Sequence, residues 1–154
     1  MKRIIAFVLA ITAITASFAG CSGGKAPAEK ATTAKAAAKI DYDLSGVSET
    51  VAYSQVYDMI MKPDDYRGKT VKVKGEFEYA DDELNGDTHY SCIVSDTKGC
   101  CKQGIEFATK EDMDFADYPV IFSKIEVTGT FDTYNIGNSE AQCVILKDAT
   151  IKEL

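Results

Sequence analysis

The amino-acid sequence predicts a mainly β domain, in which five strands form a small barrel that follows an N-terminal helix. Two features indicate the strands and their closure. Residues 68–80 and 123–134 alternate apolar and polar side chains, as strands with one buried face do. Each segment contains a glycine, Gly75 or Gly129, at which a bulge or bend would help a sheet curl into a barrel.

The first element along the chain is a helix. Ser48 is suited to cap its N-terminus, and Pro63 bars its continuation. Between them, apolar residues recur at the i, i+3, i+4, i+7 spacing of one helix face: Tyr53, Val56, Tyr57 and Ile60. We therefore expect an amphipathic helix here.

The first three strands follow. The first spans 68–80, and the dipeptide Asn85-Gly86 after it is the strongest short hairpin signal, because a type I′ turn needs positive φ at both central residues. The second strand is expected at about 88–96, and the third at 103–108.

A short helix is expected between the third and fourth strands, because Thr109 and Asp112 have the spacing of a capping box. The fourth strand, at 123–134, repeats the pattern of the first. The fifth, at 142–154, contains a continuous apolar run that is consistent with burial on both faces.

This order of elements resembles the OB-fold, a five-stranded Greek-key barrel. The stretch YRGKTVKVKGEF at 66–77, followed by VILKDATIKEL at 144–154, is similar to exported bacterial domains related to the anticodon-binding-type OB family. The resemblance covers nearly all of residues 50–154 and implies an OB-like fold for a domain at 40–154. Its motifs are turn and core residues, so it carries little information about function.

The N-terminus predicts export. Lys2 and Arg3 precede a largely apolar stretch at 4–19, which is short for a membrane span and typical of a signal peptide. The sequence Ala-Gly-Cys that ends at Cys21 resembles the lipobox of bacterial lipoproteins. That resemblance implies a signal peptide at 1–20 and diacylation of the Cys21 thiol, with chains such as palmitate that anchor the protein to the extracytoplasmic face of the cell membrane. The alternative is a plain secreted protein with a cysteine at this position by chance.

Two segments of opposite charge follow the signal peptide. Residues 21–39 begin with the lipidated cysteine and continue with four lysines, one glutamate and no large apolar side chain. We expect a flexible basic tether, which either is attracted to anionic lipid head groups or serves only as a soluble linker. The domain at 40–154 has 11 Lys and Arg against 23 Asp and Glu, a formal charge of −12. An acidic domain repels phosphate backbones, so we do not expect nucleic acid as a partner.

The cysteines are the main candidates for chemistry in the domain. Cys100 and Cys101 stand side by side, and the domain also contains Cys92, Cys143 and the single histidine, His89. Four thiols in an oxidising compartment favour disulfides. Thiolates and imidazole are also zinc ligands, and Cu(I) prefers soft ligands such as thiolates. Thiol redox catalysis is disfavoured because no C-x-x-C motif occurs, and Cys143, inside an apolar run, is the best candidate for an inert buried thiol.

The adjacent cysteines also carry a local resemblance. The stretch CCKQGIEF at 100–107 resembles part of an exported domain of certain bacterial permease subunits associated with zinc homeostasis, in which a similar double cysteine occurs. Because neighbouring strand positions face opposite sides, we expect one of Cys100 and Cys101 to face the core. The other is expected to join Cys92, with a bulge near Gly99 closing the gap, as a metal ligand pair or as a disulfide.

Together these features predict a membrane-anchored extracytoplasmic lipoprotein with a non-catalytic OB-like binding domain. The leading hypothesis is a soft-metal site for zinc or copper, with ligands drawn from Cys92, Cys100, Cys101, Cys143 and His89. The alternative is a disulfide-stapled module that binds a protein partner in the cell envelope. An enzyme is not expected, because the sequence contains no Gly-rich phosphate loop and no supported Ser-His-Asp arrangement.

Overall fold

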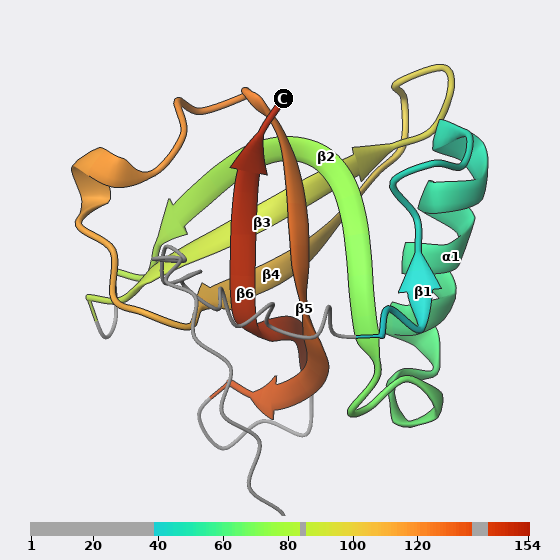
Figure 1. Cartoon of the computed structure of the whole chain (residues 1–154), viewed down its shortest axis with the longest axis horizontal. Helices are drawn as coiled ribbons and strands as arrows, with labels where there is room; N and C mark the ends of the chain where they lie inside the picture. The colour runs from blue at the N-terminus through green and yellow to red at the C-terminus, as the bar shows by residue number, and fades with distance from the viewer. Residues whose placement is uncertain (1–38, 84–85, 137–141) are drawn as a thin grey trace, which may run out of the picture. The chain divides into compact units, whose positions relative to one another are not determined.

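Strands dominate the computed structural model, which describes residues 39–83, 86–136 and 142–154 (Figure 1). The strands are β1 (Tyr42–Asp43), β2 (Thr70–Asp81), β3 (Thr88–Ser95), β4 (Lys102–Thr109), β5 (Lys124–Asn135) and β6 (Gln142–Glu153). The helical segments are α1 (Glu49–Met61) and the 3₁₀ turns η1 (Pro63–Asp65) and η2 (Phe115–Asp117). The prediction of a mainly β domain that follows a helix is confirmed.

Several predicted features fall on residues that the structure does not describe. The signal peptide, Cys21 and all of the tether except Lys39 lie outside the described residues. Asn85 of the predicted hairpin also lies outside them, while its neighbour Gly86 has the positive φ, 78°, that the turn signal implies. Within the described part of the chain, no helix is long and apolar enough to cross a membrane.

All six strands belong to one sheet. Their order is β1-β2-β3-β4-β6-β5, and β2 also pairs with β5, so each of the five long strands has a partner on both sides. The pairs are antiparallel except β1–β2 and β4–β6, which are parallel. The first half of β2, up to Glu76, pairs with β5, and its second half pairs with β3. In Figure 1, β2 arches strongly as it passes from one partner to the other.

Two glycines lie where neighbouring strands approach each other closely. A Cβ atom at Gly75, where β2 changes partner, would lie 2.3 Å from the carbonyl oxygen of Ile93 and 2.7 Å from Sγ of Cys92. A Cβ atom at Gly129 in β5 would lie 2.9 Å from Cβ of Leu146 in β6. Real Cβ atoms do not approach other atoms this closely, so a larger side chain at either position must displace its neighbours.

A bulge in β6 lies opposite Gly129. Two residues of β6, Asp148 and Ala149, face this single glycine, between regular register pairs on either side. Asp148 has a φ of 51°, a conformation that aspartate tolerates better than most residues. Such a bulge increases the local twist of a strand.

The number of strands and the second helix differ from the prediction. Among the described residues the sheet has six strands rather than five, because Tyr42–Asp43 forms a two-residue strand beside β2 that is too short to show a periodic pattern. The short helix between β4 and β5 is η2, a single 3₁₀ turn, rather than a helix that begins near Thr109. Thr109 ends β4, and its hydroxyl donates a hydrogen bond to the carbonyl oxygen of Glu111 at 2.7 Å instead of capping a helix.

The helix α1 begins where the sequence predicts. The hydroxyl oxygen of its N-cap, Ser48, accepts a hydrogen bond from the N–H of Val51 at 3.4 Å. The buried face is centred on Val56 and includes Ala52 and Met59. It is therefore rotated from the predicted face, and the side chain of Tyr57 is 47% exposed.

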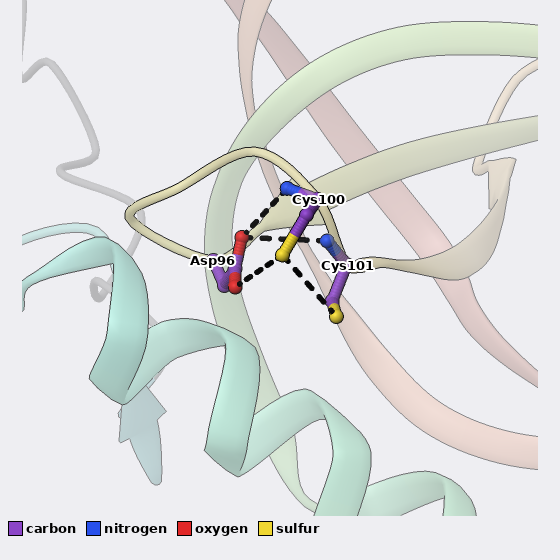
Figure 2. A group of neighbouring side chains, drawn as sticks. All are labelled: Asp96, Cys100 and Cys101. Atoms are coloured by element: carbon purple, nitrogen blue, oxygen red, sulfur yellow. Dashed lines mark hydrogen bonds between the residues drawn. The ribbon is translucent and has the colours of Figure 1, made fainter.

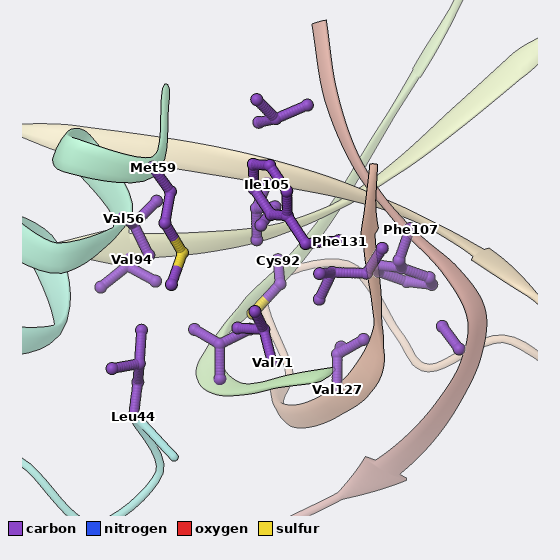
Figure 3. Packing of buried hydrophobic residues seen from close by; sticks show 14 of the residues in the cluster. Leu44, Val56, Met59, Val71, Cys92, Val94, Ile105, Phe107, Val127 and Phe131 are labelled. Carbon is purple, nitrogen blue, oxygen red and sulfur yellow. The ribbon is translucent and has the colours of Figure 1, made fainter. Parts of the chain in front are cut away.

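The core consists of the inward-facing side chains of the sheet together with those of α1 (Figure 3). Met59 and Val56 come from α1, and Tyr118, from the segment before β5, stacks on Tyr90 with 3.9 Å between ring centroids. The largest fully buried side chains are those of Phe77, Phe131, Met59, Ile105, Ile125, Leu146, Val56, Val71, Val73, Val127 and Cys92.

Replacing Gly75 or Gly129 by alanine should lower the free energy of unfolding by about 1–3 kcal/mol each, because the added Cβ overlaps backbone and core atoms. Urea unfolding followed by circular dichroism measures the change. Gly46→Ala is the matched control, since nothing lies within 4 Å of its added Cβ, and its stability should stay close to that of the wild type. Unchanged midpoints for both core glycine variants would contradict the close strand contacts.

Candidate metal centre

The tight turn between β3 and β4 carries the double cysteine. The N–H of Asp96 donates to the carbonyl oxygen of Cys101, and the N–H of Gly99 donates to the carbonyl oxygen of Asp96, both at 2.9 Å. Gly99 has a φ of 66°, which glycine adopts without strain. The chain therefore folds back locally, and Cys100 and Cys101 come directly before β4.

The side chain of Asp96 organises this turn (Figure 2). Its Oδ1 accepts hydrogen bonds from the N–H of Cys100 at 3.0 Å and from the N–H of Cys101 at 3.3 Å. Its Oδ2 accepts a hydrogen bond from the thiol of Cys100, with 3.3 Å between Oδ2 and Sγ. The two Sγ atoms lie 3.7 Å apart. One carboxylate oxygen is thus held by the backbone, while the other faces a sulfur atom.

These three side chains form a set of potential metal ligands, which we call the thiol turn: Asp96, Cys100 and Cys101. One ligand atom from each lies within 4.8 Å of the other two, and among the described residues no other group of three or more Cys, His, Asp or Glu meets this criterion. Both cysteines are exposed. Thiolates and a carboxylate are ligands that zinc accepts.

Hydrogen bonding shifts the pKa of the Cys100 thiol and the pKa of the Asp96 carboxyl group in opposite directions. The hydrogen bond to Asp96, and then the one to Cys101, raises the pKa of the Cys100 thiol to about 11. Partial burial opposes ionisation of Asp96, but hydrogen bonds from the Cys100 thiol and from backbone N–H groups outweigh it and hold the pKa of Asp96 below its usual value. At neutral pH a carboxylate therefore lies beside a protonated Cys100 thiol, and a metal ion must displace that proton.

Cys92 lies in the core and does not join the thiol turn. It is fully buried in β3, and burial raises the pKa of its thiol to about 12. The expectation that one of Cys100 and Cys101 faces the core while the other joins Cys92 is therefore wrong, since both are exposed. The strand alternation on which it rested ends at Ser95 and resumes only at Lys102.

His89 and Cys143 lie on a different part of the sheet. Nδ1 of His89 is 3.2 Å from Oε2 of Glu106 and 3.3 Å from the hydroxyl oxygen of Tyr134. Cys143, which is partly exposed rather than buried on both sides, is the register partner of Tyr134 between β5 and β6. The five predicted site residues are thus divided among three places, and only the adjacent cysteines meet.

Asp96 is the member of the thiol turn that the sequence did not reveal. It precedes Thr-Lys-Gly, and an aspartate at the start of a turn often accepts hydrogen bonds from backbone N–H groups that follow it. That signal predicts a turn. It does not indicate that the second carboxylate oxygen faces a thiol.

Comparisons of the chain with protein-family models, with curated proteins and with solved structures found no match. The residues of the site therefore carry the functional conclusion alone.

A thiol-reactive maleimide should modify Cys101 in the native protein at neutral pH, modify Cys100 more slowly because hydrogen bonding raises the pKa of its thiol to about 11, and leave Cys92 unmodified. The first two are exposed, whereas Cys92 is buried with a pKa raised to about 12 and so remains a protonated, inaccessible thiol. Peptide mass spectrometry after a short pulse distinguishes the three sites, and unfolding in urea should make Cys92 reactive. Equal labelling of Cys92 and Cys101 in the native protein would count against this arrangement.

Proposed function

We propose that this protein is a membrane-anchored extracytoplasmic lipoprotein whose OB-like domain binds zinc at the thiol turn. The observation that carries the metal proposal is the separation of 3.7 Å between the sulfur atoms of Cys100 and Cys101. Two thiolates bound at about 2.3 Å to a tetrahedral zinc ion lie about 3.8 Å apart. Two thiolates on opposite sides of an ion, at a similar bond length, would lie about 4.6 Å apart. The separation therefore favours zinc over copper held linearly between two thiolates.

Asp96 supports the same choice of metal. A carboxylate oxygen is an ordinary zinc ligand, whereas Cu(I) prefers soft sulfur ligands. The backbone N–H groups of Cys100 and Cys101 hold Oδ1, so Oδ2 can turn from the thiol to the metal without loss of the turn. Hydrogen bonds of this kind, made to a metal ligand by groups that do not themselves bind the metal, orient the ligand and strengthen metal binding. The fourth position of a tetrahedral ion is left for water or for a ligand from a partner.

The exposure of the site supports a binding role rather than an enzyme. Catalytic metal ions act in dry, shaped cavities that exclude water and fix the substrate. Both cysteines of the thiol turn are exposed on a surface turn, where an incoming molecule can exchange ligands with the metal. We therefore assign the domain to metal binding or metal delivery outside the cytoplasm.

The order of strand pairing supports the OB-like assignment. The five long strands pair in the order β2-β3-β4-β6-β5, and β5 pairs again with β2. An OB-fold is a five-stranded Greek-key barrel, and the close approaches at Gly75 and Gly129 are of the kind that strong sheet curvature requires. In this assignment β1 is an addition at the edge of β2, and α1 precedes the barrel strands.

The positions of the cysteines favour the metal hypothesis over the disulfide-stapled alternative. All four cysteines of the domain are free thiols in the structure. Cys92 is fully buried, whereas Cys100 and Cys101 are exposed on the turn, and Cys143 is the second residue of β6. Only Cys100 and Cys101 have sulfur atoms in contact, and a bond between adjacent residues closes a strained eight-membered ring.

Zinc binding should depend on the thiol turn. We expect the purified protein to bind one zinc ion. The Cys100→Ala and Cys101→Ala variants should each lose at least about tenfold in zinc affinity, and Asp96→Asn should lose about tenfold in zinc affinity. Competition with a chromophoric zinc chelator measures the affinities. Cys143→Ala removes a thiol outside the turn and should bind as the wild type does. A double variant, Cys100→Ala with Cys101→Ala, that binds zinc normally would contradict the proposal.

The same titration has a defined pH dependence. Because the pKa of the Cys100 thiol is raised to about 11, this group is protonated throughout the neutral range and must lose its proton when zinc binds. Zinc affinity should therefore increase by about tenfold for each pH unit gained in this range through Cys100 alone. An affinity that does not change with pH would exclude thiolate ligation by this residue.

Cys21→Ala should release the protein from the membrane, because the lipobox-like sequence makes this thiol the site of acylation and acyl chains supply the anchor. Fractionation of cells that express the wild type or the variant, followed by immunoblotting of washed membranes, measures the distribution. Cys143→Ala is again the control and should stay with the membranes. Retention of the Cys21→Ala variant in washed membranes would overturn the anchor.

A further inference from the structure

A hollow of about 360 Å³ opens on the outer face of the sheet, and it contains none of the residues of the thiol turn. Ser91 in β3 pairs with Glu78 in β2 and with Glu106 in β4, so these three residues form one row on the same face. In the next row, Ala80 pairs with His89. The short side chains of Ser91 and Ala80 thus lie between longer ones, which leaves a depression in the surface.

A hydrogen-bonded cluster forms one wall of this hollow. The hydroxyl of Tyr134 donates to Oε2 of Glu106 at 2.6 Å, and Nδ1 of His89 lies 3.2 Å from the same oxygen. The rings of Tyr134 and His89 are nearly parallel, at 10°, with centroids 6.3 Å apart. Burial, and then the contact with Glu106, raises the pKa of Tyr134, so its hydroxyl remains a hydrogen-bond donor. The carboxylate is therefore held in one orientation.

The charge of the hollow is negative. Four carboxylate side chains line it and no Lys or Arg does, among the described residues: Glu78, Asp81, Asp82 and Glu106. Lys102 reaches Glu78 at 3.4 Å. Glu106 has a different neighbour, since its ion-pair partner in the described part of the chain is His89, which is charged only when protonated. A carboxylate that is only 24% exposed, beside aromatic rings, is suited to pair with an incoming cation.

Apolar side chains form part of the wall of the hollow. Ile93 and Ile136 line it together with the ring of Tyr134. A volume of about 360 Å³ is at the lower end of the range for small-molecule sites. The hollow thus combines an oriented carboxylate with an aromatic ring and apolar walls, which matches a short alkyl chain that ends in a positive charge.

We propose that this hollow binds a protonated alkylamine, supplied either by a polyamine or by a lysine side chain of a peptide. The ammonium group pairs with the carboxylate of Glu106 and lies near the ring of Tyr134. The carbon chain lies along Ile93 and Ile136. This site is separate from the thiol turn, so it does not depend on zinc binding or on the lipid anchor.

Calorimetric titration of the purified full-length protein tests the site. The probes are spermidine, a short neutral peptide with one central lysine, and the same peptide with that lysine acetylated. At least one of the first two probes should bind, and the acetylated peptide should not. Binding of spermidine alone identifies a polyamine site, and binding of the lysine peptide alone identifies a peptide site. Absence of binding by both, or equal binding of the acetylated peptide, overturns the proposal.

Two variants and a control locate the binding. Glu106→Gln removes the charge with little change of shape and should weaken binding at least about tenfold. Ser91→Lys places an ammonium group between Glu78 and Glu106 and should block the hollow. Glu126→Gln is the matched control, because Glu126 pairs with Lys72 and does not line the hollow. Circular dichroism establishes that each variant is folded. An equal loss of binding in Glu126→Gln and Glu106→Gln would show general attraction to an acidic surface and overturn the site. Full binding by the folded Ser91→Lys variant would overturn it as well.

Discussion

The path of β2 through Gly75 is the constraint on which the rest of the domain depends. This strand pairs with β5 up to Glu76 and with β3 from Glu76 onward, so the backbones of β2 and β3 must come very close at the change of partner. Only glycine leaves room for the carbonyl oxygen of Ile93 and the sulfur of Cys92. The contact places the β2 backbone beside the sulfur of Cys92, which is fully buried in the core.

The cysteines show how one residue type acquires different chemistry from its surroundings. Desolvation raises the pKa of Cys92 and makes it a small apolar core residue. A hydrogen bond to a carboxylate raises the pKa of Cys100, although that side chain is exposed. The first effect cannot be removed without unfolding. The effect of the hydrogen bond on Cys100 disappears when a cation takes the place of the thiol proton. Of these two thiols, only the exposed one can therefore change its state when a cation binds.

The sequence predicts the long strands well, because alternation and strand glycines are local signals that the pleated sheet reproduces directly. It misses β1, since two residues show no period, and it misplaces the short helical turn because Thr109 uses its hydroxyl within a loop. The expectation for the cysteines was wrong for a local reason: Gly99 turns the chain before Cys100, so alternation does not apply there. The sequence could not predict the cluster of His89, Glu106 and Tyr134, because its three members come from three different strands.

The place of β6 in the sheet affects when the domain can fold. This strand comes last among the six along the chain, yet it lies between β4 and β5 and pairs with both. Before it arrives, each of these strands has an open edge, and the core lacks Leu146 and Val144. Long-range pairing of this kind makes folding slow and all-or-none, because chain entropy is lost before the contacts form. For the exported lipoprotein that we propose, this order would be an advantage: the polypeptide would stay extended while it threads through a translocation channel, and it would collapse only after the final strand had emerged on the far side.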